Sequence, residues 1–420
     1  MRRVVLTVLF ASVVTLIQAQ PRRAAPSLLI RNISLIDGTG GPLRAGVNVF
    51  TRDGRIVSVG SDAPDAELAI DGRGLFLLPG LIDAHVHLSG DSWNGQVEML
   101  GRMLRGGVTS VFDVAGDDRS VSNLARAAIA GEIESPTITY ASLFAGPEFM
   151  SDPRLIASSV GFRAGDAPWA REIRPETDMV RAVAEARGAG ATWIKLYAAL
   201  DGATVRKIGD EARKQQVSLI AHATVFPARP SDLVAAGVKI LAHAAYLVWE
   251  GMPPSAEFQK RARGDFASVP ADGPVITQLL QSMKDHDVAL NPTLWIFAEG
   301  SGKDDLSGVR TPWMNTVTKR AQDLGVTIAA GVDSLFAPRD PLPLLHREME
   351  AMVNGARLTP LQAITSATRG AAHAMGIDGA RGSVAAGKAA DLLIVEGDPT
   401  VDIRNTRRIK FVIKDGRIVR

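Results

Sequence analysis

Short apolar runs alternate with amphipathic stretches between residues 79 and 378. A short run bounded by turn residues predicts a buried strand, whereas apolar residues recurring every three or four positions predict a helix. The expected strands are Gly80–Leu88, Val108–Val114, Thr137–Ala141, Trp193–Tyr197, Ser218–His222, Lys239–His243, Ala289–Thr293 and Thr327–Asp333. The expected helices are Val97–Arg105, Val121–Ala130, Thr177–Arg187, Ala203–Lys214, Pro230–Ala236, Val275–His286 and Trp313–Leu324. This α/β alternation of eight units predicts a (β/α)8 TIM barrel.

An open, doubly wound sheet would show the same alternation, but no Gly-rich phosphate loop follows the first expected strand. Two connections are long, at 143–176 and 246–273. Long connections in a compact domain are usually functional. We therefore expect both to rise over the mouth of the barrel.

The two ends of the chain resemble each other. Asp53-Gly54-Arg55-Ile56-Val57 recurs as Asp415-Gly416-Arg417-Ile418-Val419. Asp-Gly between strand-like runs is a strong hairpin signal. Residues 27–78 and 379–420 both have the pattern of short strands, so we expect them to form one small β-sandwich domain beside the barrel at 79–378.

The N-terminus has the three parts of a secretory signal peptide. Arg2 and Arg3 precede an apolar run from Val4 to Ile17, and small and polar residues surround Ala19. The run is shorter than the roughly 20 residues of a membrane span, although an uncleaved anchor is the alternative. Removal of residues 1–19 takes two arginines and no acids, so the net charge falls from +2 to 0. We expect a secreted or periplasmic enzyme with no membrane attachment after cleavage.

Composition narrows the chemistry. The chain has no cysteine, which excludes disulfides, thiolate metal ligands and cysteine nucleophiles. Charged residues make up 22% of the chain without a long basic run, so a nucleic-acid partner is not indicated. The expected partner is a small-molecule substrate, and a homo-oligomer stays open.

Candidate metal ligands fall at the ends of expected strands. His85 and His87 are two residues apart, so both side chains point to one side of the first strand. A His-x-His pair is a weak signal alone. However, the carboxyl ends of barrel strands form one face, where active sites are built. The residues that would join the pair there are Lys195, His222, His243 and Asp333.

Imidazole and carboxylate ligands suit zinc. Lys195 is unusual in such a set, because an ammonium would be repelled by metal ions. Its neighbours Ile194 and Leu196 are apolar, and a buried lysine tends to lose its charge. A neutral amine can take up carbon dioxide and become a carbamate, which is an anion able to bridge two metal ions.

These stretches make the chain similar to the amidohydrolase superfamily, in its two-metal form with a carboxylated lysine. Within it, the chain most resembles the imidazolonepropionase-like group that includes prolidase-like dipeptidases. The matching stretches are Leu78–His87, Trp193–Tyr197, His222, His243, Gly331–Ser334 and Gly387–Leu392.

The resemblance implies two divalent metal ions, with zinc expected. It implies that His85, His87 and Asp333 hold the first ion and that His222 and His243 hold the second. The carboxylated Lys195 would bridge them, and a metal-bridging hydroxide would be the nucleophile. Asp333 would shuttle the proton, and Tyr197 would help to polarise the scissile carbonyl.

The sequence departs from prolidase-like relatives where those proteins grip substrate. No histidine follows the third expected strand, and Thr224 and Val225 stand where an aromatic residue is common. We expect Phe144, Tyr246 and Trp249 to line an apolar pocket instead. Asp83 is expected deeper in the barrel as a structural residue, and His346 is a candidate to support the metal ligands. The histidines that we expect in helices are His286, His346 and His373.

The expected reaction is hydrolysis of an amide-type C–N bond in a small molecule, such as an Xaa-Pro or other dipeptide, or an N-acyl amino acid. Three alternatives stay open: a lactone or ester hydrolase using the same site, a mononuclear deaminase that would not need Lys195, and a catalytically inactive scaffold. A periplasmic sugar-binding protein would show two hinged lobes instead of eight units.

Overall fold

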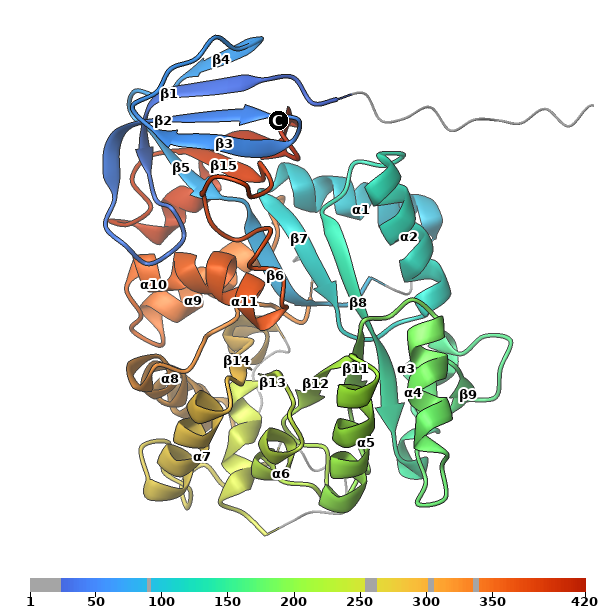
Figure 1. Ribbon diagram of the computed structural model, residues 1–420. Helices are drawn as coiled ribbons and strands as arrows, with labels where there is room; N and C mark the ends of the chain where they lie inside the picture. Colours follow the sequence, from blue (N-terminus) through green and yellow to red (C-terminus); the bar gives the residue numbers. More distant parts are fainter. Residues whose placement is uncertain (1–23, 89–91, 254–262, 301–305, 335–339) are drawn as a thin grey trace, which may run out of the picture.

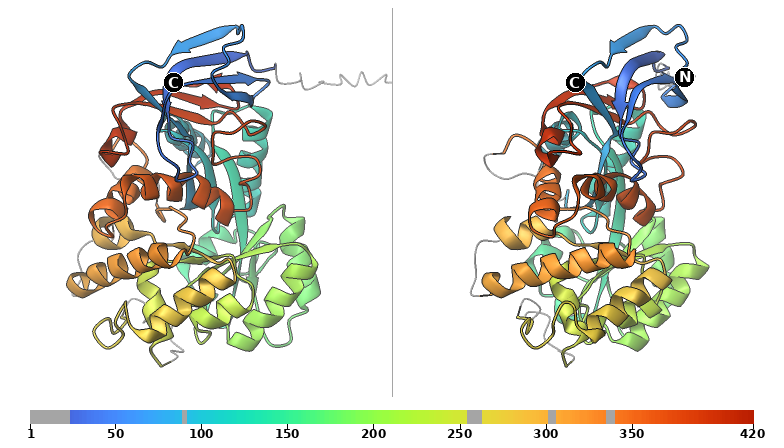
Figure 2. Two further views of the ribbon diagram at one scale, coloured as in Figure 1. Left: turned by 60° about the vertical axis from the view of Figure 1, so that its left-hand side comes forward. Right: turned by 90° about the vertical axis from the view of Figure 1, so that its left-hand side faces the viewer.

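The computed structural model describes residues 24–88, 92–253, 263–300, 306–334 and 340–420. The predicted signal peptide, residues 1–19, lies outside the described residues. A barrel with an outer layer of helices carries a separate sheet at one end (Figures 1 and 2). Within the described ranges, no helix combines the length and apolar character needed to cross a bilayer.

Seven strands of the barrel pair in parallel, each with the next in chain order. They are β6 (Leu81–Val86), β7 (Val108–Asp113), β8 (Thr137–Ala145), β11 (Trp193–Leu196), β12 (Ser218–His222), β13 (Ile240–Ala242) and β14 (Ala289–Asn291). The side chains of these strands are almost all buried on both faces, as expected for a parallel sheet covered by helices.

The eighth unit differs from the predicted strand. Residues 327–333 form no regular strand and make only an isolated bridge, between Ile328 and Leu290. This closing segment still joins the two edges of the sheet: Ala329 N donates to Leu290 O, and Ala84 N donates to Ala330 O, both at 2.9 Å. The barrel fold is therefore confirmed, and the last gap is closed by backbone hydrogen bonds rather than by a regular strand.

The predicted helices are all present. The barrel helices are α1 (Trp93–Arg105), α2 (Asp118–Ala130), α4 (Met179–Gly188), α5 (Gly202–Lys214), α6 (Pro230–Ala235), α7 (Pro274–Asp285) and α8 (Ser307–Leu324). After the closing segment follow α9 (Leu345–Asn354), α10 (Pro360–Thr365), the π-helix η5 (Ser366–Gly370) and α11 (Ala371–Ala374). Aspartates cap several helices, because their side chains accept backbone N–H groups of the first turn: Asp117, Asp178 and Asp201.

The connection after β8 is more ordered than a simple loop. It contains the short 3-10 helix η1 (Pro147–Phe149), α3 (Pro153–Ser158), β9 (Asp166–Ala167) and β10 (Ala170–Glu172). Because β10 pairs with the last residues of β8, this connection is fixed to the barrel at both ends. After β13 follows the 3-10 helix η2 (Ala244–Glu250), and after β14 the π-helix η4 (Ile296–Gly300).

Both chain ends build one eight-stranded mixed sheet, as the repeated hairpin motif predicts. Its order is β17-β16-β15-β5-β1-β2-β3, with β4 on β1. The strands are β1 (Leu28–Leu35), β2 (Arg44–Arg52), β3 (Arg55–Gly60), β4 (Leu68–Asp71), β5 (Leu75–Pro79), β15 (Leu392–Glu396), β16 (Ile409–Lys414) and β17 (Arg417–Ile418). The 3-10 helix η6 (Ile403–Arg407) lies between β15 and β16. The sheet encloses its own apolar core, which includes Leu28, Val49 and Ile394.

The terminal sheet contacts the amino-terminal side of the barrel. β5 runs into β6 through Gly80, whose N–H donates to Asp391 O at 2.9 Å. Lys414 is buried and donates to Asp391 and, at 2.9 Å, to Thr137 Oγ1 at the start of β8.

His346 is also buried at this end of the barrel: its ring contacts Gly106 O and Thr406 Oγ1, and burial lowers its pKa to about 4. The hypothesis that His346 supports the metal ligands is therefore wrong, since Gly106 precedes the start of β7.

We expect Asp391→Asn to destabilise the protein by about 3 kcal/mol, because it leaves the buried Lys414 ammonium and Arg381 without their main counter-charge. Urea unfolding followed by circular dichroism measures this change. The control is Asp71→Asn, which removes an exposed pair with Arg73 and should leave the midpoint unchanged. Equal midpoints for both variants would contradict a structural role for the buried cluster.

Candidate metal centre

Four histidines, an aspartate and a lysine meet at the carboxyl end of the barrel. The ring centroids of His85 and His243 lie 5.0 Å apart, and those of His243 and His222 lie 4.7 Å apart. The ring of His87 is 5.5 Å from that of His85, and Lys195 Nζ lies 3.4 Å from His85 Nε2. Asp333 joins the group at the end of the closing segment. The six residues that the sequence singles out as ligands are thus neighbours in space.

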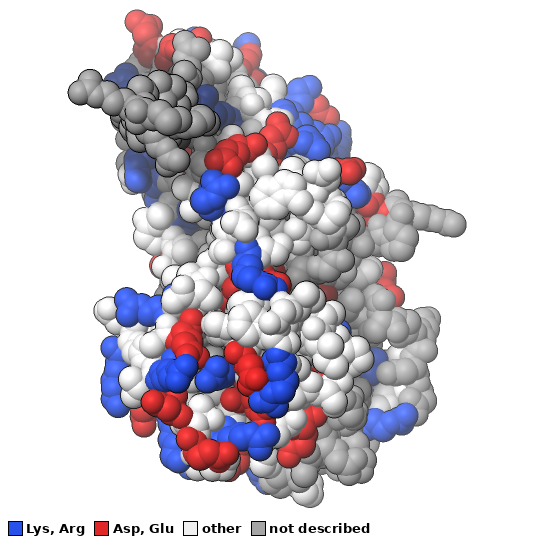
Figure 3. Space-filling model, turned by 90° about the vertical axis from the view of Figure 1, so that its right-hand side faces the viewer, with Lys and Arg blue, Asp and Glu red and all other residues white. Residues whose placement is uncertain are grey.

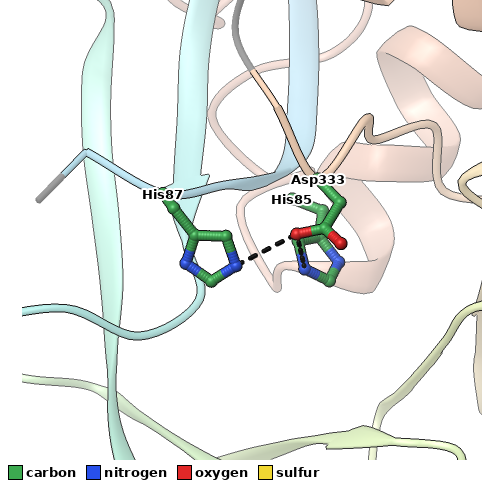
Figure 4. A group of neighbouring side chains, drawn as sticks. All are labelled: His85, His87 and Asp333. Atoms are coloured by element: carbon green, nitrogen blue, oxygen red, sulfur yellow. Dashed lines mark ion pairs between the residues drawn. The ribbon is translucent and has the colours of Figure 1, made fainter. Parts of the chain in front are cut away.

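Three of them form the tightest group. Among the described residues, His85, His87 and Asp333 have ligand atoms that all lie within 4.8 Å of one another. Asp333 Oδ1 is 3.1 Å from His87 Nε2 and 3.4 Å from His85 Nε2. Figure 4 shows both rings presenting these nitrogens to one carboxylate. Two imidazole nitrogens and one carboxylate oxygen form a donor set that suits zinc.

The hydrogen bonds of Asn291 fix the proton on His85. Asn291 Nδ2 donates to Ala329 O at 2.9 Å, so the amide oxygen is the atom that faces His85 Nδ1 at 2.7 Å. An amide oxygen only accepts, which places the ring proton on Nδ1 and leaves the lone pair on Nε2. His87 is fixed in the same way, because its Nδ1 faces Ala115 O at 3.0 Å. Both lone pairs therefore point at Asp333.

The other two histidines rest on threonine hydroxyls. His222 Nδ1 is 2.7 Å from Thr224 Oγ1, and His243 Nδ1 is 2.9 Å from Thr293 Oγ1. All four histidines thus use Nδ1 for a contact within the protein, which leaves Nε2 for a ligand at the mouth. Such outer contacts hold a ligating imidazole in orientation.

Burial removes positive charge from this group. Burial lowers the pKa of His85 to about 4 and lowers the pKa of His243 well below its usual value. At neutral pH the neutral ring of His85 therefore presents its Nε2 lone pair to the Asp333 carboxylate. Acceptors converging without a donor between them fit a bound cation.

Lys195 is placed to lose its own charge. Its side chain is 1% exposed, and burial lowers its pKa to about 8. At pH 7 roughly one amine in ten is then neutral, as the difference from the pKa requires. A neutral amine is the form that can react with carbon dioxide.

The backbone around the site is strained at several strand ends. Positive φ angles occur at Ala115 (146°), Ala199 (56°), His243 (75°), Thr293 (51°) and Asp333 (59°). Such conformations persist only where the surrounding structure imposes them, and they cluster at functional sites. Gly331 adds a close approach, since a Cβ there would lie 2.6 Å from His85 N.

Two buried aspartates hold the histidine segments. Asp83 Oδ1 accepts from His85 N at 3.2 Å and from Val332 N at 3.3 Å, which joins β6 to the closing segment. The expected structural role of Asp83 is confirmed. Asp113 accepts from Leu88 N at 2.6 Å and from Ala115 N at 3.2 Å, and so supports the backbone on both sides of His87.

The aromatic candidates have different positions. The ring of Tyr197 lies 5.1 Å from that of His222, and Tyr246 stacks on His222 at 4.8 Å. Both rings therefore border the site. Trp249, in η2, is buried, and its ring lies 4.7 Å from that of Phe226, which follows β12.

Phe144 does not join the site. It is fully buried and belongs to the apolar core between sheet and helices. It has the same strand parity as Ser142, which donates to Asp118 of α2 at 2.6 Å. Alternate residues of β8 share a face, so Phe144 points toward the helices. Its expected contact with substrate is wrong because β8 continues to Ala145.

Several supporting residues escaped the sequence analysis. They are Asn291, Thr224, Thr293 and Phe297, whose ring lies 5.7 Å from that of His243. Asn291 and Thr293 lie in the second half of the predicted strand Ala289–Thr293, so their position near its carboxyl end offered a signal. Phe297 offered none, because it lies in a π-helix that the residue pattern does not indicate.

The model of the Amidohydrolase family matches residues 76–419. An allantoinase of Solibacter usitatus (strain Ellin6076) is 33% identical over 135 residues, which are 30% of this chain and 29% of that protein. An N-acyl-D-aspartate deacylase of Alcaligenes xylosoxydans xylosoxydans is 46% identical over 69 residues, or 16% of this chain and 14% of that protein. The matched segments thus span less than a third of these relatives.

Among solved structures, a Xaa-Pro dipeptidase with bound methionine in the active site superimposes with a TM-score of 0.73. It is 21% identical, and the match covers 93% of this chain and 99% of that chain. At this identity the likeness shows the fold. It extends over both the barrel and the terminal sheet.

We expect Asn291→Leu to weaken metal binding by about 10–100-fold, because His85 loses the acceptor that orients its ring. Competition with a chromogenic chelator measures the affinity. The control is Asn48→Leu in the terminal sheet, where Asn48 accepts from Asn32 N and donates to Ser61 O. Unchanged affinity in the Asn291 variant would contradict the assigned role.

Proposed function

The chain belongs to the amidohydrolase family, and from this we propose that it hydrolyses an amide-type carbon–nitrogen bond of a small molecule. One observation carries the proposal: the lone pairs of His85 and His87 converge on the Asp333 carboxylate at the barrel mouth. This is a site for a divalent cation, and hydrolysis is the chemistry that such a cation promotes.

We assign two metal ions to the site. His85, His87 and Asp333 would hold one, and His222 and His243 would hold the other. Lys195, as a carbamate, would lie between them, which its contact with His85 and its burial support. When bound, the ions would polarise a carbonyl oxygen and lower the pKa of water toward ~7. Zinc is the proposed metal, since imidazole and carboxylate are ligands it prefers.

The protein's own groups would then move protons and orient the substrate. Asp333 Oδ1 lies between the two imidazoles, where it can accept a proton from the attacking water and return it to the leaving nitrogen. Tyr197 borders His222, where its hydroxyl can donate to a carbonyl oxygen that gains charge. Tyr246 and Phe297, whose centroids lie 5.3 Å apart, would supply an apolar wall.

The proposed substrates are dipeptides, including Xaa-Pro, and N-acyl amino acids. The names of two relatives support this class, since one is an N-acyl-D-aspartate deacylase and another a Xaa-Pro dipeptidase. The allantoinase supports the wider class of carbon–nitrogen hydrolases. We further propose that the enzyme acts outside the cytoplasm, on the basis of residues 1–19.

The first test combines metal analysis with a substrate screen. We expect two metal ions per chain and hydrolysis of dipeptides or N-acyl amino acids. Lys195→Met should lower the metal content and reduce kcat by at least about 100-fold, whereas the exposed control Lys239→Met should change neither. One metal ion with deamination would favour the mononuclear alternative. Turnover of lactones or esters without any amide would replace the amide proposal.

The second test concerns Asp333. Asp333→Asn keeps the shape of the side chain but removes its basicity, so we expect kcat to fall by about 10²–10⁴-fold. Metal content must be measured in the same preparation, because Asp333 is also a proposed ligand. A variant that retains two ions and full activity would exclude the proton-transfer role.

A further inference from the structure

An arginine stands next to the proposed active site. Arg154 lies in α3, in the connection after β8, and its guanidinium carbon is 5.9 Å from the centroid of the Tyr197 ring. The same ring lies 5.2 Å from Lys195 Nζ and 5.1 Å from the ring of His222. A permanent cation is therefore one aromatic ring away from two of the proposed metal ligands.

Arg154 is held in place before any substrate binds. Asp152 Oδ1 accepts from Arg154 Nε at 3.0 Å, and Asp152 Oδ2 accepts from Nη2 at 2.8 Å. The hydroxyl of Tyr197 is a further hydrogen-bond partner of the guanidinium. Asp152 is largely buried, while the side chain of Arg154 is 63% exposed. The guanidinium is thus oriented on one edge and open to solvent over much of its surface.

Local pairing with aspartate is not by itself a sign of function in this protein. The same Asp-x-Arg contact occurs at Asp71–Arg73, Asp117–Arg119 and Asp402–Arg404. Basic and acidic side chains lie beside one another over the face shown in Figure 3. What distinguishes Arg154 is its neighbour, since it faces Tyr197 at the mouth of the barrel.

The interactions around Arg154 suit an anion. The hydrogen bonds that Arg154 donates to Asp152 raise the pKa of its guanidinium further above the usual value, and the hydroxyl of Tyr197 adds to this. An arginine fork is the side chain best matched to a planar carboxylate.

We propose that Arg154 binds the free carboxylate of the substrate, on the leaving-amine side of the scissile bond. This inference rests on the proposed amide hydrolysis and narrows it to N-acyl amino acids and dipeptides. In these molecules the carboxylate carbon is three bonds from the scissile carbonyl carbon, or about 3–4 Å. A substrate with its carboxylate at Arg154 and its scissile carbonyl near His222 would therefore extend across the Tyr197 ring, which lies between these two residues. Neutral amides, lactones and esters lack the group that Arg154 would bind.

The experiment compares an acid with its neutral analogue. The probes are N-acetyl-L-phenylalanine and N-acetyl-L-phenylalaninol, in which a hydroxymethyl group replaces the carboxylate. For the wild type we expect kcat/KM for the acid to exceed that for the alcohol by about 10–100-fold, the range of a charge-assisted hydrogen bond. Arg154→Gln should remove this preference through KM, and Arg154→Lys should keep part of it. The alcohol should be hydrolysed equally by all three proteins.

Arg404→Gln is the matched control. It breaks the same kind of aspartate pair, at Asp402, in η6 beside the terminal sheet, and should leave the preference intact. Calorimetric binding of L-phenylalanine and L-phenylalaninol provides a readout without turnover, with the same expected dependence on Arg154. Equal binding and turnover of acid and alcohol by the wild type would overturn the role of Arg154 while leaving amide hydrolysis in place. If the metal-loaded wild type cleaves neither probe but binds L-phenylalanine selectively, the result would count against amide hydrolysis and leave the carboxylate-binding role of Arg154 in place.

Discussion

The hydrogen bond from His85 Nδ1 to Asn291 Oδ1 is the interaction on which the proposed site depends. Asn291 is itself oriented by Ala329 O in the closing segment, so the amide cannot present its nitrogen to the ring. The ring proton is thereby fixed on one side and the lone pair on the other. Because burial keeps His85 neutral, this lone pair meets the Asp333 carboxylate without a proton between them. Acceptors brought together in this way are costly unless a cation joins them, which is why the geometry indicates a metal centre.

The same segment closes the barrel and completes the proposed site. Asp333 N donates to His85 O, and Val332 N donates to Asp83, so the closing segment that completes the barrel also carries its carboxylate to the histidines. Gly331 permits this approach, and the positive φ of Asp333 directs its side chain into the mouth. The terminal sheet contributes from the other end: β5 leads directly into β6, and the buried Lys414–Asp391 pair joins the sheet to β8. Support for the site thus extends through the full length of the barrel.

At the mouth of the barrel, the proposed metal ligands would carry out catalysis, and Arg154 would select the substrate. The histidines come from the ends of paired strands, and Asp333 comes from the closing segment, where its N–H donates to His85 O. Arg154 comes from the connection after β8, which is fixed by β10 but is free to differ in sequence without disturbing the barrel. A site built in this way can keep its hydrolytic chemistry while the connections determine which molecules enter. Such a division would allow relatives that are named for different substrates to share one fold.

The sequence by itself determined the alternation of strands and helices, the pairing of the two chain ends and the residues that meet at the mouth. These follow from short-range periodicity and from the rule that parallel strands share a carboxyl edge. It did not determine the irregular closing segment, the inward or outward direction of Phe144, or the partners of His85 and His346. Phe144 points toward the helices because β8 extends past it to Ala145. The partners of the two histidines are distant in the chain: Asn291 lies 206 positions from His85, and Gly106 lies 240 positions from His346. Only tertiary packing decides such contacts, because burial of a polar group depends on which acceptor the fold brings to it.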